Sequence, residues 1–409
     1  MPRILYLASV LPARTETFVY REILALRELG MEIVSASVHA PERDLGDERL
    51  AHMARETLEL YTYPPLYIAG HLLGALLRRP LRSGATLARA LADALSPRGD
   101  LTIAQRPKVL VQVLHALALA HRLRSRGITH IHAHLAHVPT TIAMYAARQL
   151  GIGFSFTGHA NDLFPQRALL VTKLRRARFV SCISSWHRRF YQSLVPRSDE
   201  DLPVVRCGVD TTLIHANAAP GRQALEVLAV GRLVEKKGFD LLIEALGAVA
   251  ERTSASLHLI LAGSGPEEGR LRALSATLPP GVTVDLLGDT PNDAVMELME
   301  RADLFVLPCR VTASGDRDGI PVVLMEAMAH GRCVVTGDLE AIRELVEDRV
   351  TGLTIPSGDS QALEKVLAEL LADRERIETL GRAGRRRVEE EFDLTLNARR
   401  LLACFAREG

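Results

Sequence analysis

The stretch Asp316–Gly331, DRDGIPVVLMEAMAHG, decides the fold of the second half of this chain. It follows a short apolar run, Leu304–Leu307, which is typical of a buried strand. Pro321 stands where a helix is expected to begin, a position that suits proline. A strand that leads through a loop into a helix is the repeating unit of a parallel α/β sheet.

The same alternation extends in both directions from this stretch. Short β-branched runs predict strands at Ile4–Val10, Ile33–Val38, Thr129–Ala133, Phe154–Thr157, Arg178–Ile183, Leu225–Val230, Leu257–Ala262, Val282–Leu287 and Cys333–Thr336. Amphipathic stretches predict helices at Thr17–Leu29, Pro139–Leu150, Phe239–Val249, Pro266–Leu274 and Asn292–Glu300. Two such sets predict an α/β protein with two doubly wound domains.

The domain boundaries follow from composition. The segment 217–222, NAAPGR, has linker composition and precedes a fresh strand. We place an N-terminal domain at 1–212, a C-terminal domain at 213–390, and a last helix at 391–409. Ligands in open α/β sheets sit beyond the carboxyl ends of the strands, so a cleft between the two domains is the expected site.

Composition excludes several classes of protein. The formal net charge is +1 and aromatic residues make up 4%, which argues against a nucleic-acid partner. The five cysteines are odd in number and scattered, as expected for reduced thiols in the cytoplasm. The N-terminus lacks the pattern of a signal peptide, and no apolar run reaches the ~20 residues of a membrane-spanning helix.

Residues 61–126 interrupt the alternation with a long, basic and helical stretch. Ten arginines and lysines there face only Asp93 and Asp100. One interpretation is an extra helical layer on the N-terminal domain. The other is a surface that rests on anionic lipid at the inner face of the cell membrane. The two interpretations are compatible and both stay open.

The loop before the expected helix has the properties of an anion site. First-turn amides from Ile320 to Val323 would point beyond the strand ends, and a helix N-terminus binds phosphate in this way. Asp318 lies just before the helix and Glu326 lies inside it. Carboxylates on either side of a phosphate-binding turn can accept hydrogen bonds from sugar hydroxyls.

A second loop, Gly231–Gly238 (GRLVEKKG), supplies cations after another expected strand. Fixed cations on such a loop can meet negative charge on phosphate oxygens. Arg232 offers a bidentate fork and Lys237 a point charge, with adjacent Lys236 as the alternative to Lys237. Gly263 and Gly265 follow the next strand, and they allow a close backbone approach to a ligand.

These motifs resemble those of retaining family-4 glycosyltransferases with the GT-B fold. Asp318 to Gly331 resembles the E-x7-E signature, with an Asp where the family has Glu, and Gly231–Gly238 resembles G-R-x-x-x-x-K-G. The resemblance implies two Rossmann-like domains facing a cleft and transfer from a nucleotide-sugar donor with no metal or other cofactor. It implies these donor-binding residues: Gly231, Gly263, Gly265, Gly319, Ile320, Pro321, Val322, Val323 and Glu326.

The resemblance also implies catalytic roles for Arg232, Lys237 and Asp318, and for His159 in the segment Ser155–Asp162, SFTGHAND. The family's His faces the reacting sugar across the cleft. On the acceptor side it implies the following residues: Thr15, Glu16, His134 and Asp162. The segment Thr15–Phe18, TETF, resembles the S-E-T-F variant of exopolysaccharide transferases of the colanic-acid and amylovoran type, so the expected acceptor is a glycan or a lipid-linked sugar. Thr15 is expected to cap the following helix, with Glu16 in its first turn.

Other readings of the same residues stay open. Asp318 and Glu326 could be the two carboxylates of a glycoside hydrolase, or the chain could be a catalytically weak GT-B-like scaffold in polysaccharide assembly. The spacing of His132 and His134 suits metal ligands on one face of a strand, but no carboxylate neighbours them in the sequence. The D-x-D at 316–318 is interpreted as chance. No G-x-G-x-x-G follows the first strand, which disfavours a dehydrogenase.

Overall fold

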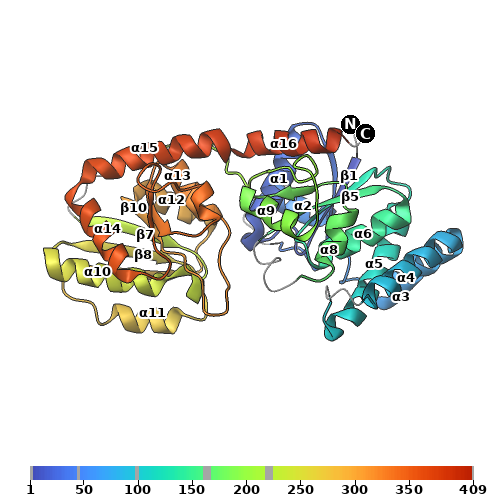
Figure 1. Cartoon of the computed structure of the whole chain (residues 1–409), viewed down its shortest axis with the longest axis horizontal. Coiled ribbons are helices and arrows are strands. Elements are labelled where there is room, and N and C mark those ends of the chain that lie inside the picture. Colours follow the sequence, from blue (N-terminus) through green and yellow to red (C-terminus); the bar gives the residue numbers. More distant parts are fainter. Residues whose placement is uncertain (1–2, 44–46, 97–100, 160–166, 217–223, 408–409) are drawn as a thin grey trace. The chain divides into compact units, whose positions relative to one another are not determined.

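The computed structural model describes the chain except residues 1–2, 44–46, 97–100, 160–166, 217–223 and 408–409 and the side chain of Thr15. The chain forms two compact units (Figure 1): Met1–Cys207 with Leu394–Gly409 is unit 1, and Gly208–Asp393 is unit 2. The boundaries predicted from the sequence fall after residues 212 and 390, within five residues of those in the structure. The backbone N–H of Val209 donates to Phe392, and the Thr211 hydroxyl donates to Asp393, which ties the start of unit 2 to its end.

Unit 1 is built on a parallel six-stranded sheet of order β3-β2-β1-β4-β5-β6. Its strands are β1 (Arg3–Ala8), β2 (Glu32–Ser37), β3 (Leu58–Glu59), β4 (His130–His134), β5 (Gly153–Gly158) and β6 (Val180–Cys182). Its helices are η1 (Arg14–Glu16), α1 (Thr17–Glu28), α2 (Glu48–Glu56), α3 (Pro65–Arg78), α4 (Pro80–Ala94), η2 (Ile103–Gln105), α5 (Arg106–Leu123), α6 (Val138–Leu150), α8 (Leu170–Arg176), α9 (Ser185–Leu194) and α16 (Leu394–Ala406).

Helices cover both faces of this sheet. One apolar cluster joins the strands to α5, α6 and α8, and another joins them to α1 and α16. The last helix α16 returns to unit 1 because Ala398, Leu401 and Phe405 lie on one helical stripe and are buried against Val19 and Ile23 of α1. The central strand β4 is buried along its whole length, as expected for a parallel sheet covered on both sides.

The basic segment 61–126 forms α3, α4, η2 and α5. Helix α5 packs against α6 and belongs to the core layer through residues such as Val113 and Ala116. Helices α3 and α4 lie outside it, at the outer edge of unit 1 in Figure 1. None of the helices in the described part of the chain is long and apolar enough to cross a membrane.

Unit 2 is a second parallel six-stranded sheet, of order β12-β11-β10-β7-β8-β9. Its strands are β7 (Leu225–Val230), β8 (Leu257–Ala262), β9 (Val282–Gly288), β10 (Leu304–Leu307), β11 (Cys333–Gly337) and β12 (Leu353–Ile355). Its helices are η3 (Glu235–Lys237), α10 (Phe239–Thr253), α11 (Glu268–Ser275), α12 (Asn292–Arg301), α13 (Val322–Ala329), η4 (Ile342–Glu344), α14 (Ser360–Ala372) and α15 (Arg374–Glu391). The prediction of two doubly wound α/β domains is confirmed.

Candidate functional site

The helix predicted from the first stretch of sequence is α13. Pro321 occupies its N-cap position, so the helix begins at Val322, one residue later than the sequence suggested. The first N–H groups of any helix have no partner inside it, and here they belong to Val322 and the half-buried Val323. Ile320 is buried under this turn and Gly319 is half-buried. The α13 N-terminus therefore has the form expected of an anion site.

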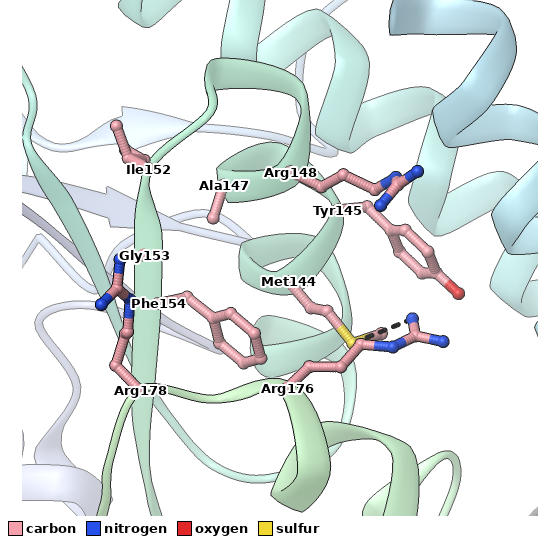
Figure 2. Close-up of a pocket in the computed structure, with 9 residues that line it drawn as sticks. All are labelled: Met144, Tyr145, Ala147, Arg148, Ile152, Gly153, Phe154, Arg176 and Arg178. Carbon is pink, nitrogen blue, oxygen red and sulfur yellow. Dashed lines mark hydrogen bonds between the residues drawn. The ribbon is translucent and has the colours of Figure 1, made fainter.

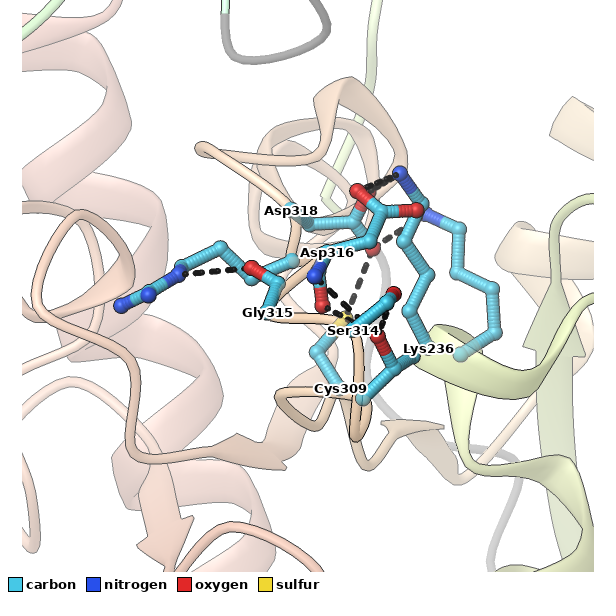
Figure 3. A network of polar contacts seen from close by, with 9 residues as sticks. Lys236, Cys309, Ser314, Gly315, Asp316 and Asp318 are labelled. Carbon is cyan, nitrogen blue, oxygen red and sulfur yellow. Dashed lines mark hydrogen bonds and ion pairs between the residues drawn. The ribbon is translucent and has the colours of Figure 1, made fainter. Parts of the chain in front are cut away.

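Charged side chains gather just before α13 (Figure 3). The Lys237 Nζ lies 2.9 Å from Asp318 Oδ2, and the Lys236 Nζ lies 3.1 Å from Asp316 Oδ1 and 3.7 Å from Asp318 Oδ1. The Cys309 thiol donates to Asp318 Oδ2 over 3.4 Å. The structure thus brings Lys237 and Asp318, two of the three predicted catalytic residues of unit 2, into direct contact. The D-x-D carboxylates are each paired with a lysine.

The Lys237–Asp318 pair is largely buried, and each of its two charges shifts the pKa of the other. Burial alone would raise the pKa of Asp318, but the ammonium groups of Lys237 and Lys236 outweigh it and hold that pKa below its ordinary value. Burial opposes the charge on Lys237, and Asp318 outweighs it and raises the Lys237 pKa. Burial beside Asp318 raises the pKa of the Cys309 thiol. The stable form of the site is therefore an ionised carboxylate with an ionised lysine over a neutral thiol.

The loops that carry these residues are locked together by backbone packing. A Cβ on Gly263 would stand 1.9 Å from the Gly231 carbonyl oxygen, and one on Gly265 would stand 2.4 Å from that of Leu233. Gly263 also has φ +144°. From the sequence we expected these glycines to let a ligand approach the backbone. In the structure they let the loop after β8 pack closely against the loop after β7.

The remaining predicted residues of unit 2 lie on the same elements. Arg232 is exposed, and its positive charge acts on the buried Lys237. Glu326 is 3% exposed and lies in the middle of α13, a helix whose other side chains are apolar. The roles predicted for Arg232 and Glu326 stay predictions.

In unit 1 the predicted His159 ends a chain of hydrogen-bonded side chains. Its Nε2 lies 3.3 Å from His134 Nδ1, and His134 Nε2 lies 2.9 Å from Glu22 Oε1. The Tyr6 hydroxyl donates to the same carboxylate oxygen. The Phe18 ring lies 4.4 Å from the His159 ring, centroid to centroid. His134 is thus fully buried behind His159.

Burial and the neighbouring His134 hold the pKa of His159 well below its ordinary value, so its imidazole is neutral. Sequence reasoning missed Glu22, Tyr6 and Cys309. A signal for Glu22 was available, because it lies on the same helical stripe as the buried Val19.

Glu22 also corrects one argument about metals. The sequence showed no carboxylate beside the histidines, but the fold brings Glu22 within metal-ligand distance of His132 and His134. Both ring nitrogens of His132 are already bonded, to Ser155 over 2.8 Å and to Thr157 over 3.1 Å. An ion would have to displace these bonds.

Three acceptor-side predictions meet different outcomes. Glu16 takes the N-cap position of α1, and its side chain makes no capping hydrogen bond. Thr15 lies in the preceding turn η1, so the prediction that it caps α1 is wrong, and the expected first-turn place of Glu16 is wrong too. Asp162 lies outside the described residues.

A cavity of about 340 Å³ opens elsewhere on unit 1 (Figure 2). It is lined by Phe154 at the start of β5, Arg148 of α6, and Arg176, among others. Arg176 forms an ion pair with Asp93, at 2.6 Å. Because β5 begins here and ends at Gly158, just before His159, this cavity lies at the opposite edge of the sheet from the histidine cluster.

Comparison with known proteins identifies the second half of the chain. Residues 211–387 match the family described as "Glycosyl transferases group 1". AmsK of Erwinia amylovora, an amylovoran biosynthesis glycosyltransferase, is 34% identical over 209 residues, which cover 51% of each chain. WcaL of Escherichia coli (strain K12), provisionally named a colanic acid biosynthesis glycosyltransferase, is 37% identical over 214 residues, also 51% of each. The matches thus span about half the length of these relatives.

Solved structures extend the likeness in fold to the whole chain. The crystal structure of Anabaena Alr3699/HepE in complex with UDP has a TM-score of 0.73 and covers 99% of this chain and 100% of that one, at 17% identity. The fold is GT-B, with two Rossmann-like domains. The predicted resemblance to group 1 and to exopolysaccharide transferases is confirmed.

Proposed function

We propose that this chain is a retaining glycosyltransferase of exopolysaccharide or cell-surface polysaccharide biosynthesis. It moves a sugar from a nucleotide-diphosphate donor to a glycan or lipid-linked acceptor in the cytoplasm. The observation that carries the proposal is the largely buried contact between Lys237 and Asp318, 2.9 Å, beside the N-terminus of α13. It lies in the segment that matches the group 1 family. The relatives named above and the UDP bound by HepE support the same chemistry.

The charges of the cluster suggest how the donor is handled. A diphosphate at the α13 N-terminus would accept hydrogen bonds from the first-turn amides and from Lys237. Lys237 would then exchange a carboxylate oxygen of Asp318 for a phosphate oxygen. Asp318 would become the acceptor for a hydroxyl of the donor sugar. Arg232, which no carboxylate holds in the described part of the chain, would meet the charge that grows as the diphosphate leaves.

The glycoside hydrolase alternative fits less well. A general acid needs a raised pKa so that it can hold a proton at working pH. The pKa of Asp318 is held below its ordinary value by two lysines. A scaffold protein would have the same fold but would not turn over any donor, so the assay below distinguishes it from an enzyme.

The test is release of nucleoside diphosphate by the full chain from UDP-, GDP-, ADP- and TDP-sugars, with and without EDTA. We expect turnover with at least one donor, and we expect it to survive EDTA because Arg232 and Lys237 can take the place of a metal. Arg232→Ala should lower kcat on the order of 10²–10³-fold. The matched control is Arg399→Ala, an exposed arginine of α16.

Two results would contradict the proposal. Absence of turnover with every donor would favour the scaffold. Turnover that EDTA abolishes and Mn²⁺ or Mg²⁺ restores would refute its metal-free form.

A further inference from the structure

The corner between α3 and α4 exposes an unusual run of side chains. Residues 77–82, LRRPLR, are all exposed, and Leu77 and Leu81 are 73% and 89% exposed. Exposed leucines are costly in water, since burying such a side chain contributes about 1.5–3 kcal/mol. Here two of them flank Arg78 and Arg79, and Arg82 follows at once. The α3–α4 corner, as we call residues 77–82, lies at the outer edge of unit 1 (Figure 1).

The helices on either side of the corner, and α5, carry further exposed apolar side chains. Fifteen large apolar side chains are exposed in the described part of the chain, and eleven of them lie on or between α3, α4 and α5. These are Leu66, Tyr67, Leu73, Leu77, Leu81, Leu91, Leu95, Ile103, Leu110, Val111 and Leu114. Exposed apolar residues scattered singly are ordinary, whereas a concentration of them marks a surface that meets a partner.

The charge of this surface is of one sign. Arg78, Arg79, Arg82 and Lys108 are all exposed. Within the described part of residues 61–126 the carboxylate is Asp93, which is buried and paired with Arg176 at 2.6 Å. The surface is therefore apolar and cationic and shows no exposed acid among its described residues. Its complement must offer both hydrocarbon and negative charge.

We propose that the α3–α4 corner docks on an anionic lipid bilayer. Leu77 and Leu81 enter the acyl region just below the headgroups, while Arg78 and Arg79 contact lipid phosphates. The Arg82 guanidinium donates to the Leu150 carbonyl over 3.2 Å, which holds it against the end of α6. Helices on a bilayer surface bury their apolar face about 5–10 Å deep and keep cations at the headgroups. Anionic headgroups attract basic segments, and here Leu77 and Leu81 flank Arg78 and Arg79 with no exposed acid in the described part of residues 61–126. The mixture fits a headgroup layer better than a protein partner.

This docking goes beyond the proposed transfer reaction and does not depend on it. A lipid-linked acceptor would reach a docked enzyme by diffusion in two dimensions. Binding to vesicles is measured with no donor or acceptor present, so its failure would leave the transferase proposal untouched.

The test is co-sedimentation of the full chain with phosphatidylcholine vesicles, with and without phosphatidylglycerol. We expect binding to the anionic vesicles, weaker binding to the neutral ones, and weakening by salt. Arg78→Gln/Arg79→Gln should lower the partition coefficient about 25-fold, roughly fivefold for each arginine. Leu77→Gln/Leu81→Gln should lower it about tenfold or more.

Matched controls are Arg386→Gln/Arg399→Gln and Leu213→Gln/Val350→Gln, which change exposed residues outside this surface. They should bind vesicles like the parent chain. Equal binding by the corner variants and the parent, or absence of binding to anionic vesicles, would overturn the proposal. So would a dimer in solution that Leu77→Gln/Leu81→Gln converts to monomer without any vesicle binding, because the surface would then be an interface between copies.

Discussion

Asp318 holds the Lys237 ammonium at 2.9 Å, so an incoming diphosphate must compete with a carboxylate for that cation. Two acids on either side of a phosphate site also repel the phosphate itself. The sequence assigned Asp318 to the sugar and Lys237 to the diphosphate as separate contacts. Their direct pairing links the two roles, since removing one charge changes the partner available to the other.

The first prediction concerns Asp318→Asn. We expect transfer to be crippled, because the sugar loses its carboxylate contact. Binding of the bare nucleoside diphosphate should become tighter, by at least about tenfold, since the competing negative charge is gone. Calorimetric titration with the nucleoside diphosphate and a turnover assay measure the two effects. Asp318→Glu is the control and should keep substantial activity. Normal transfer by Asp318→Asn would leave Asp318 as a loop residue.

The second prediction concerns Glu22 and the tautomers behind His159. Glu22 accepts from Tyr6, and a carboxylate accepts only, so His134 must donate to it through Nε2–H. In a singly protonated His134 ring, Nδ1 is then an acceptor, and His159 donates to it through its own Nε2–H. This order leaves Nδ1 of His159 as the acceptor nitrogen of that ring. Glu22 therefore positions His159 through His134.

Glu22→Ala should lower kcat, because His134 and His159 lose their fixed tautomers. It should also destabilise unit 1 by about 1–3 kcal/mol, since buried donors lose their partner. Glu22→Gln retains an acceptor oxygen and should recover much of both losses. Turnover and thermal unfolding of the two variants check this. Equal turnover in Glu22→Ala and the parent chain would show that the tautomers do not matter for transfer.

At the scale of elements, the loop after β8 offers a test of how the site is held. Gly263→Ala would place a methyl 1.9 Å from a backbone oxygen of Gly231, which has no flexible side chain to move. The loop that carries Arg232 must shift. We expect a loss of stability of about 1–3 kcal/mol or more and weaker nucleoside diphosphate binding. Thermal unfolding and titration with the nucleotide measure both.

The matched control is Gly269→Ala in α11. A Cβ there meets nothing within 4 Å, and alanine favours a helix by about 0.8–1 kcal/mol over glycine. Gly269→Ala should therefore be neutral or stabilising. If Gly263→Ala behaved in the same way, the close approach of the two loops would not be needed for the site.

The elements also show what sequence patterns can and cannot predict. β-Branched and apolar runs of four to seven residues predicted the strands that form the centres of both sheets. The edge strands β3, Leu58–Glu59, and β12, Leu353–Ile355, were missed because two or three residues cannot display a periodicity. Helix α13 was predicted to within one residue, since Pro321 punctuates its start. Glu22 was missed because its partners lie on strands far away in the sequence.

At the scale of the whole molecule, many histidines share a lowered pKa, which no single motif reveals. At least eight histidines of the described part of the chain have pKa values below the ordinary one, with burial as the first cause. Seven of the eight lie in unit 1, and burial and Arg178 lower the pKa of His130 to about 4. The folded chain therefore holds these rings neutral, whereas the unfolded chain protonates them below about pH 6.5.

The sign of the effect follows from proton binding. Between about pH 6.5 and 4 the unfolded state binds more protons than the folded state, so stability rises with pH there and is lost as pH falls. Each such histidine contributes a slope of up to about 1.4 kcal/mol per pH unit. The contribution of Asp318 to stability is lost only at lower pH. Its pKa is below the ordinary value of an aspartate, so the unfolded state binds the proton first as pH falls through that value.

The last prediction is that unit 1 unfolds at progressively lower urea concentration as pH falls from 7 to 5. Trp186, the single tryptophan, lies in α9 of unit 1, so its fluorescence reports this unit. His130→Gln should flatten the pH slope by the share of one histidine, whatever it does to stability at pH 7. His52→Gln replaces an exposed histidine and should leave the slope unchanged. A slope that is the same in the parent chain and in His130→Gln would mean that His130 already carries a proton in the folded state, which its burial between Phe179 and Phe405 opposes.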